Sequence, residues 1–224
     1  MRRREPAVSG AVATAASRGP GRRASPVRPN RHMFEFLQPT PVIDSASATV
    51  VGKAAEIAGD ADTDEEVARR CFLWVRDDVR HSSDHRISIV TCSASEVLEH
   101  RTGFCYAKSH LLVALLRARG IPAALCYQRL SLDSTATTFC LHGLVAVHLQ
   151  RHGWYRVDPR GDKPGITTDF CPPVERLAFT SRLPGEMDID GLFPDALPGV
   201  VSALRRWRTS EEVSMNLPDY APEA

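Results

Sequence analysis

A helix with marked ends follows a turn and a cysteine near the middle of the chain, and it constrains the fold more than any other stretch. Residues 103–122 open with Gly-Phe-Cys, continue through leucines at helical spacing, and close with Gly-Ile-Pro. Gly120 suits the position just past a helix, and Pro122 prevents the helix from resuming. Cys105 therefore falls in the first helical turn, where free N–H groups and the helix dipole stabilise a thiolate. A buried structural cysteine is the alternative, because free cysteines are among the most buried residues.

Three further helices are predicted upstream of this one. Residues 46–58 show apolar side chains at helical spacing and are followed by a glycine. A Thr-Asp-Glu-Glu sequence at 63–66 fits a capping box and opens a helix that runs to about Val79. A Ser-Ala-Ser-Glu sequence at 93–96 fits a second capping box and opens a short helix over 95–100. The first half of the chain is therefore predicted to be helical.

The apolar period changes after the central helix. Residues 123–130, 141–149 and 154–157 are predicted strands, and the short loops between them favour an antiparallel sheet. The chain beyond them is rich in Pro, Gly and Asp, and we expect mostly loops there, with a short strand at 176–180 and a last helix at 197–208. Helices followed by a strand meander predict an α+β fold.

Three chemically active side chains occupy informative places in this pattern. Cys105 begins the central helix, His142 lies at the start of the second strand, and Asp158 closes the third. A tight hairpin sets the start of one strand beside the end of the other, so His142 and Asp158 are expected to be neighbours. Cysteine, histidine and aspartate would then act as nucleophile, base and orienting group. Three alternatives stay open: His142 as an ordinary strand residue, Asp158 as a turn former before Pro159, and Cys140 as a competing thiol.

Other polar groups receive weaker assignments. Two histidines flank Asp84 at His81 and His85, but a polar loop is the favoured interpretation. His110 follows Cys105 by five residues, a helical separation that points it away from the sulfur. No CxxC or HxxxH pair gives zinc-ligand spacing, and no metal or cofactor is predicted. Nothing marks the chain as secreted, so reduced thiols are expected for all six cysteines, which are residues 71, 92, 105, 126, 140 and 171.

The charge is distributed unevenly along the chain. Residues 1–32 carry eight Arg against one acidic residue, a net charge of +7, whereas the remainder carries 20 Lys and Arg against 26 Asp and Glu, a net charge of −6. The Arg-, Pro- and Gly-rich residues 1–32 are predicted to be a disordered leader, with translation from Met33 as the alternative. Residues 33–224 are expected to form a single domain with its core at about 64–160.

The composition also narrows the partners. Residues 33–224 are mildly acidic, and they lack the basic surface that a nucleic-acid-binding protein needs, so no nucleic-acid partner is predicted. No apolar run approaches the ~18–20 residues that span a bilayer, so no membrane partner is predicted and a cytoplasmic location is expected. The oligomeric state is left open.

Several segments together resemble the transglutaminase-like (papain-like) superfamily, and most of all its bacterial domain proteins. The resemblance covers about residues 64–160 and rests on Gly-Phe-Cys at 103–105, Arg-Ala-Arg-Gly-Ile-Pro at 117–122, His-Gly at 142–143 and Gly-Trp-Tyr-Arg-Val-Asp-Pro at 153–159. The three catalytic positions of the family pattern fall on Cys105, His142 and Asp158. The resemblance implies that the helix carrying the cysteine packs on an antiparallel sheet.

The resemblance also implies cysteine chemistry on a peptide or protein amide through a thioester. Transglutamination, deamidation and proteolysis share that intermediate, and they differ in whether an amine or water accepts the acyl group. Calcium activates some animal relatives, but no acidic loop in this chain has comparable ligand spacing. The chain departs from the family pattern in two places. Leu144 stands where an aromatic often follows the histidine, and no upstream aromatic or Gln stands out as the second oxyanion donor, Ser95 and Tyr106 being only nearby polar groups. A non-catalytic binding or scaffold domain that keeps this fold is the alternative.

Overall fold

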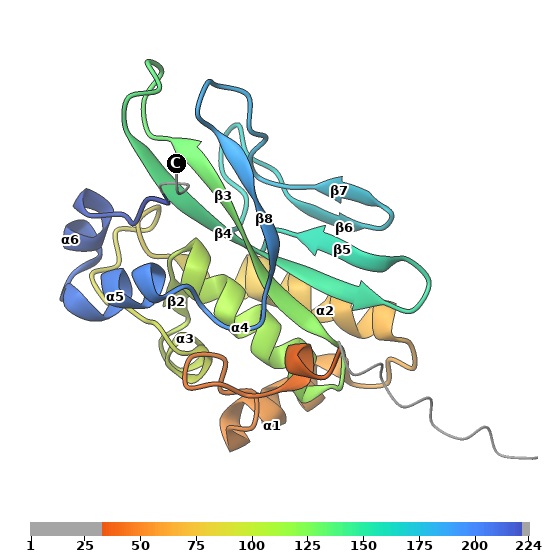
Figure 1. Cartoon of the computed structure of the whole chain (residues 1–224). Helices are drawn as coiled ribbons and strands as arrows, with labels where there is room; N and C mark the ends of the chain where they lie inside the picture. Colours follow the sequence, from red (N-terminus) through yellow and green to blue (C-terminus); the bar gives the residue numbers. More distant parts are fainter. Residues whose placement is uncertain (1–32, 221–224) are drawn as a thin grey trace, which may run out of the picture.

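The structure, a computed structural model, describes residues 33–220, and the leader predicted at residues 1–32 lies outside them. Helices gather on one side of a four-stranded antiparallel sheet with strand order β5-β4-β3-β8 (Figure 1). After a short 3-10 turn at Glu35–Leu37, the elements follow in this order: α1 (Ala48–Ala58), α2 (Asp64–Asp78), β1 (Arg80–His81), α3 (Ala94–His100), β2 (Thr102–Gly103), α4 (Cys105–Ala118), β3 (Ala123–Ser131), β4 (Phe139–Leu149), β5 (Gly153–Val157), β6 (Asp169–Cys171), β7 (Val174–Arg176), β8 (Met187–Phe193), α5 (Pro198–Arg206) and α6 (Ser210–Met215). The α+β fold class predicted from the sequence is confirmed.

Helix α4 forms the centre of the molecule. Every residue from Cys105 to Arg117 is buried, because α4 packs on β3 and β4 on one side and on α1, α2 and α3 on the others. A helix that is apolar nearly all round is expected in such a position. Gly120 follows with φ +73°, the left-handed conformation that glycine adopts without steric cost, so the predicted end of the helix is confirmed.

Arg117 does more than provide a favourable charge at the end of α4. Its guanidinium is buried and donates hydrogen bonds to the carbonyl oxygens of Gln38, Ala123 and Pro194. These acceptors come from the N-terminal segment, the start of β3 and the chain after β8. One side chain therefore ties three distant segments to the end of the central helix.

The two predicted capping boxes differ in the structure. Ser93 and Glu96 form the complete reciprocal box at the start of α3. At α2 the Thr63 side chain accepts from the Glu66 N–H at 3.2 Å, but the Glu66 carboxylate instead pairs with Arg69 and Arg70. The α2 box is therefore only half formed, because two cations compete for the carboxylate.

The sheet contains a strand that the sequence pattern did not reveal. The three predicted strands correspond to β3, β4 and β5, and β8 adds a fourth by pairing with β3. Its sequence, Met-Asp-Ile-Asp-Gly-Leu-Phe, is interrupted by Gly191 at φ +106°, and its pairing contains a register shift. The predicted strand at 176–180 is wrong: β7 ends at Arg176, and the following residues form an irregular segment beside Asp158.

The C-terminal helix is shorter than predicted. Helix α5 ends at Arg206, and Thr209 and Glu212 then form a capping box that opens a separate helix, α6, which the sequence analysis missed. None of the helices within residues 33–220 combines the length and apolar character that a bilayer crossing requires.

Candidate active site

Two short strands deliver Cys105 to the start of α4. Strands β1 and β2 pair in parallel, with His81 opposite Gly103, and β2 runs through Phe104 into the helix. Gly103 is needed for close approach, because a Cβ on it would lie 2.9 Å from the Ala107 Cβ. The glycine of the Gly-Phe-Cys sequence therefore lets the chain turn tightly into α4.

Cys105 opens onto a cleft of about 730 Å³. Only 8% of the residue is exposed, so the sulfur is reached through this cleft. The same cleft is lined by His142, His81, Arg160 and Phe179. The predicted nucleophile and the predicted base therefore share one opening.

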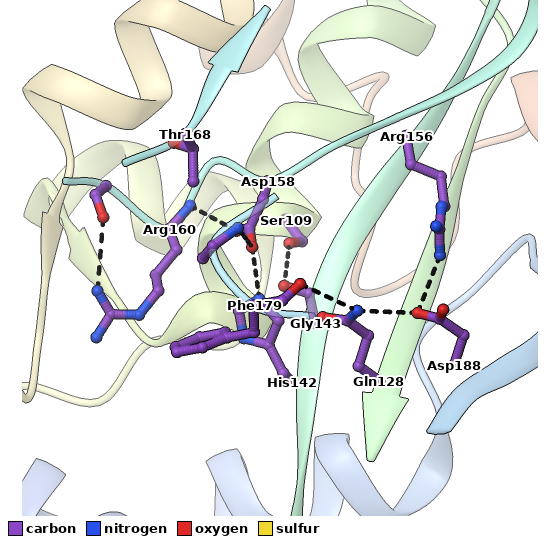
Figure 2. Close-up of polar contacts among 12 residues, drawn as sticks. Ser109, Gln128, His142, Gly143, Arg156, Asp158, Arg160, Thr168, Phe179 and Asp188 are labelled. Atoms are coloured by element: carbon purple, nitrogen blue, oxygen red, sulfur yellow. Dashed lines mark hydrogen bonds and ion pairs between the residues drawn. The ribbon is translucent and has the colours of Figure 1, made fainter. Parts of the chain in front are cut away.

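The histidine–aspartate pair is buried and directly bonded. His142 Nε2 lies 2.7 Å from Asp158 Oδ2, and neither side chain is more than 5% exposed (Figure 2). The strand register explains this contact, because Val145 on β4 faces Val157 on β5, and Asp158 leaves β5 alongside the part of β4 that carries His142. Since Nε2 is bonded to Asp158, Nδ1 is the ring nitrogen left to face Cys105.

Asp158 is held by three donors. Besides the His142 ring, the backbone N–H groups of Arg160 and Ala178 donate to its carboxylate at 3.0 and 3.2 Å. Burial alone would raise the pKa of Asp158, but the His142 charge and these hydrogen bonds outweigh it and lower the pKa below its usual value. Asp158 is therefore a fixed anion at neutral pH.

The charge of His142 follows from the same contacts. Burial opposes the imidazolium, but the Asp158 carboxylate and Cys105 together raise the pKa of His142 to about 10. The ring also meets Phe179 edge to face, with ring centroids 4.9 Å apart and planes at 85°. Phe179 is positioned in turn by Gln128 on β3, whose amide donates to its carbonyl at 3.4 Å (Figure 2). The geometry favours a desolvated imidazolium between an aspartate and a thiol.

The glycine after His142 brings β4 against α4. A Cβ on Gly143 would lie 3.0 Å from the ring of Tyr106 and 3.1 Å from its Cα, so a larger residue would push the strand away from the helix. Ser109 donates to the Gly143 carbonyl at 3.1 Å, and the Tyr106 hydroxyl donates to the Leu141 carbonyl. The His-Gly sequence therefore has a packing reason: it sets the strand beside the residue that follows Cys105.

Several sequence expectations change at this site. The Tyr106 hydroxyl is already engaged with Leu141, and Ser95 lies on α3 with its N–H bonded to Asp44, so neither is a second oxyanion donor. Leu144 is fully buried in a small apolar cluster with Ala124, Cys126, Ala146 and Phe36. Leu144 therefore packs in the hydrophobic core.

The competing thiol and the other histidines lie in less reactive settings. Cys140 lines the cleft, but burial raises the pKa of its thiol to about 12, so it stays protonated at neutral pH. His110 is buried in the core, where its Nδ1 lies 2.7 Å from the Cys92 carbonyl. His148 stacks edge to face on Trp154, outside the cleft.

Sequence reasoning missed Phe179, Arg160 and the position of His81. His81 lies in the expected polar segment, yet it is 9% exposed and its Nδ1 is 3.5 Å from Asp84 Oδ2. Burial and the nearby Arg160 lower the pKa of His81 to about 3, so this ring is neutral. Within residues 33–220, no group of three or more His, Cys, Asp or Glu side chains is arranged to hold a metal ion.

The chain is similar to one protein family and to several solved structures. Residues 52–159 match the family model of the transglutaminase-like superfamily. Among solved structures, a "Putative Cysteine Protease" from Cytophaga hutchinsonii matches with a TM-score of 0.48 and 20% identity over 58% of this chain and 43% of that one. The periplasmic domain of TgpA from Pseudomonas aeruginosa gives a TM-score of 0.45 and 19% identity over 60% of this chain and 48% of that one.

A transglutaminase is also among the similar solved structures. Red sea bream transglutaminase gives a TM-score of 0.34 and 16% identity over 57% of this chain and 25% of that one. The chain thus spans less than half the length of each of these three solved structures. None of the curated proteins compared with the sequence matches it significantly.

Proposed function

From the transglutaminase-like superfamily domain that this chain carries over residues 52–159, we propose that the protein performs cysteine-dependent acyl transfer or hydrolysis on peptide or protein amides. One observation carries the proposal: Cys105 at the start of α4 and His142, which is bonded to the buried Asp158, line a single cleft. A thiol, a charged imidazole and a fixed carboxylate are the groups that thioester chemistry uses.

The first half of the reaction forms a thioester. The Cys105 thiolate attacks the amide carbonyl carbon, and the oxyanion accepts a hydrogen bond from the Cys105 N–H at the start of α4. His142 gives its proton to the amide nitrogen as the C–N bond breaks, so the amine leaves neutral. Asp158 keeps the ring oriented and stabilises its positive charge before the transfer.

The second half regenerates the thiol. Water or an amine approaches the thioester, and neutral His142 removes a proton as the new C–O or C–N bond forms. The C–S bond then breaks and restores the thiolate–imidazolium pair. With water the reaction is proteolysis or deamidation, and with an amine it is transglutamination. Both acceptors remain within the proposal, and the cytoplasmic location remains a prediction.

Selective alkylation tests the proposal without a known substrate. We expect limiting iodoacetamide at neutral pH to label Cys105 before the other five cysteines, as read by peptide mapping. Cys140→Ala is the matched control, because it removes the second thiol of the cleft and should leave the labelling of Cys105 unchanged. Cys105→Ala should abolish both the labelling and any release of ammonia or amine from a glutamine-containing peptide panel. Equal labelling of all thiols in the folded protein would favour the non-catalytic scaffold.

A further inference from the structure

The charged side chains of the cleft suggest which substrates it accepts. Apart from histidines, the charged residues that line it are Arg160, Arg182 and Glu186. The chain after residue 32 has a net charge of −6, so two arginines at the reactive opening contrast with the rest of the body. Their hydrogen bonds determine how much of this positive charge is left for a ligand.

Arg160 forms a buried part of the cleft wall. Its side chain is only 7% exposed, and its guanidinium lies over the Phe179 ring at 5.8 Å. Both contacts with Asp84, at 2.8 and 3.1 Å, are made by Nη2 alone. Nη1 has only a 3.5 Å contact with the Gly161 carbonyl, and among the described residues Nε has no acceptor. Nε and one hydrogen of Nη1 therefore remain as donors for a ligand.

The charge of Arg160 is only partly neutralised by its neighbours. Asp84 also binds Lys163, whose Nζ lies 3.1 Å from Asp84 Oδ1, so one carboxylate serves two cations. His81, the other ionisable group beside them, is neutral. The group formed by Arg160, Lys163 and Asp84 therefore carries a net charge of about +1 at the cleft wall.

A second cation, Arg182, also lines the cleft. Arg182 is exposed, and among residues 33–220 its side chain makes no hydrogen bond or ion pair. The one anion that lines the cleft, Glu186, is already occupied by the backbone N–H groups of Ser131, Arg182 and Leu183, at 3.0, 2.8 and 2.9 Å. The Glu186 carboxylate therefore stabilises the backbone of its own loop and does not pair with the Arg182 guanidinium.

We infer that Arg160 and Arg182 form an anion subsite in this cleft, and that the protein selects amides with a carboxylate close to the scissile bond. The inference rests on the proposed function, because it assigns the substrate class of the same site. Arg160 would donate one charge-assisted hydrogen bond to the carboxylate, from Nε or from Nη1, because Asp84 already holds Nη2. Arg182 would attract it at the rim. Both residues lie beyond residue 159, where the family match ends.

Two alkylating reagents that differ only in charge test this subsite. Iodoacetate carries a carboxylate beside the reacting carbon, whereas iodoacetamide carries a neutral amide, and both form the same C–S bond with loss of iodide. We measure the rate of Cys105 labelling by each reagent, and take the ratio of the two rates. For the wild type this ratio should exceed the ratio measured with free cysteine.

The variants separate the two arginines from general charge effects. In Arg160→Gln and Arg182→Gln the ratio should fall, by about tenfold for Arg160, the size of one charge-assisted hydrogen bond, and by less at the exposed rim. Arg176→Gln is the matched control: Arg176 is exposed at the end of β7, does not line the cleft, and should leave the ratio unchanged. Arg182 makes no contact with Asp84, so Arg182→Gln leaves the buried Asp84 hydrogen bonds intact. If Arg160→Gln unfolds, the rate ratio of Arg182→Gln alone decides whether the anion subsite exists.

Protection experiments identify the source of the carboxylate. We compare how far three small amides slow the labelling of Cys105 by iodoacetamide. N-acetylglutamate α-amide has a side-chain carboxylate, N-acetylglutamine has a terminal carboxylate, and N-acetylglutamine amide has neither. Protection by the first only indicates an acidic side chain, protection by the second only indicates a free C-terminus, and the third is the neutral control. If Cys105 is labelled selectively but neither arginine variant changes the rate ratio, the anion subsite is wrong and the proposed function stands. If neither reagent labels Cys105 selectively, the proposed function fails as well.

Discussion

Replacement of Asp158 by Asn tests whether the aspartate supplies charge or only orientation. Asp158 is fully buried, and its carboxylate accepts from His142 and from two backbone N–H groups. An asparagine side chain has nearly the same shape and keeps one acceptor oxygen, but it carries no charge. The His142 ring would then lose the carboxylate that, together with Cys105, raises its pKa from 6.5 to about 10.

The expected effect is large because the pair is buried. Two unit charges about 4 Å apart attract by about 4 kcal/mol at an effective dielectric constant of about 20. A pKa change of one unit corresponds to about 1.4 kcal/mol, so losing the carboxylate should lower the pKa of His142 by roughly three units. At pH 7 the imidazolium would then change from nearly the only form to about half of the molecules, and it would be a minor form by pH 8.

The pH dependence of Cys105 alkylation by iodoacetamide measures this change directly. In the wild type we expect fast labelling at neutral pH, because the imidazolium beside the sulfur favours attack by the thiolate. In Asp158→Asn the rate should fall about twofold at pH 7 and about tenfold at pH 8, in step with the imidazolium fraction, and the two profiles should converge near pH 10. Asp190→Asn removes an exposed carboxylate on β8 and serves as the control. Superimposable profiles for folded wild type and Asp158→Asn would refute the reasoning.

Two other substitutions examine the packing around the pair. Gly143→Ala places a Cβ 3.0 Å from the Tyr106 ring, so we expect a loss of about 1–3 kcal/mol in the free energy of unfolding, measured in urea, together with slower labelling of Cys105; an unchanged unfolding midpoint would show that the strand shifts freely. Phe179→Ala admits water to the His142 ring, so the low-pH labelling of Cys105 should weaken while Phe179→Leu retains most of it, and equal profiles for both variants would assign Phe179 no shielding role.

Local patterns in the sequence determine much of this site. Helix α4 was predictable because its leucines, Gly120 and Pro122 mark its face and its end. The contact between His142 and Asp158 was predictable from the hairpin, since the three-residue turn at 150–152 leaves little freedom in the register of β4 and β5. What the sequence could not give is the depth of burial, which determines the charge of the imidazole.

Long-range contacts account for most of what was missed. Strand β8 pairs with β3 across about sixty residues, and its glycine and bulge hide the alternation that identifies a strand. Phe179 lies in an irregular segment held by hydrogen bonds to Gln128 and Asp158, and no periodicity marks such a segment. Arg160 looks like an ordinary surface arginine in the sequence, and only the structure shows it inside the cleft wall.

A buried lysine beside the pair gives the protein an unusual dependence of stability on pH. Lys108 lies one turn after Cys105, is 1% exposed, and donates to the carbonyl oxygens of Arg76 and Val79 at the end of α2. Burial lowers the pKa of Lys108 from 10.5 to about 7. Between these values the unfolded chain binds the lysine proton and the folded chain does not, so this group makes stability rise with pH.

His142 contributes the opposite slope over the same range. Its pKa is about 10 in the folded protein against 6.5 unfolded, so the stability that it adds is complete below pH 6.5 and is lost as the pH rises towards 10. Each group alone would change the free energy of unfolding by up to about 1.4 kcal/mol per pH unit, with opposite signs, so the wild type should be nearly flat between pH 7 and 9.5. Urea unfolding of Lys108→Met should reveal stability that falls over this range, and His142→Gln should reveal stability that rises. Parallel curves for the two variants would mean that at least one of these groups keeps its ordinary pKa in the folded protein.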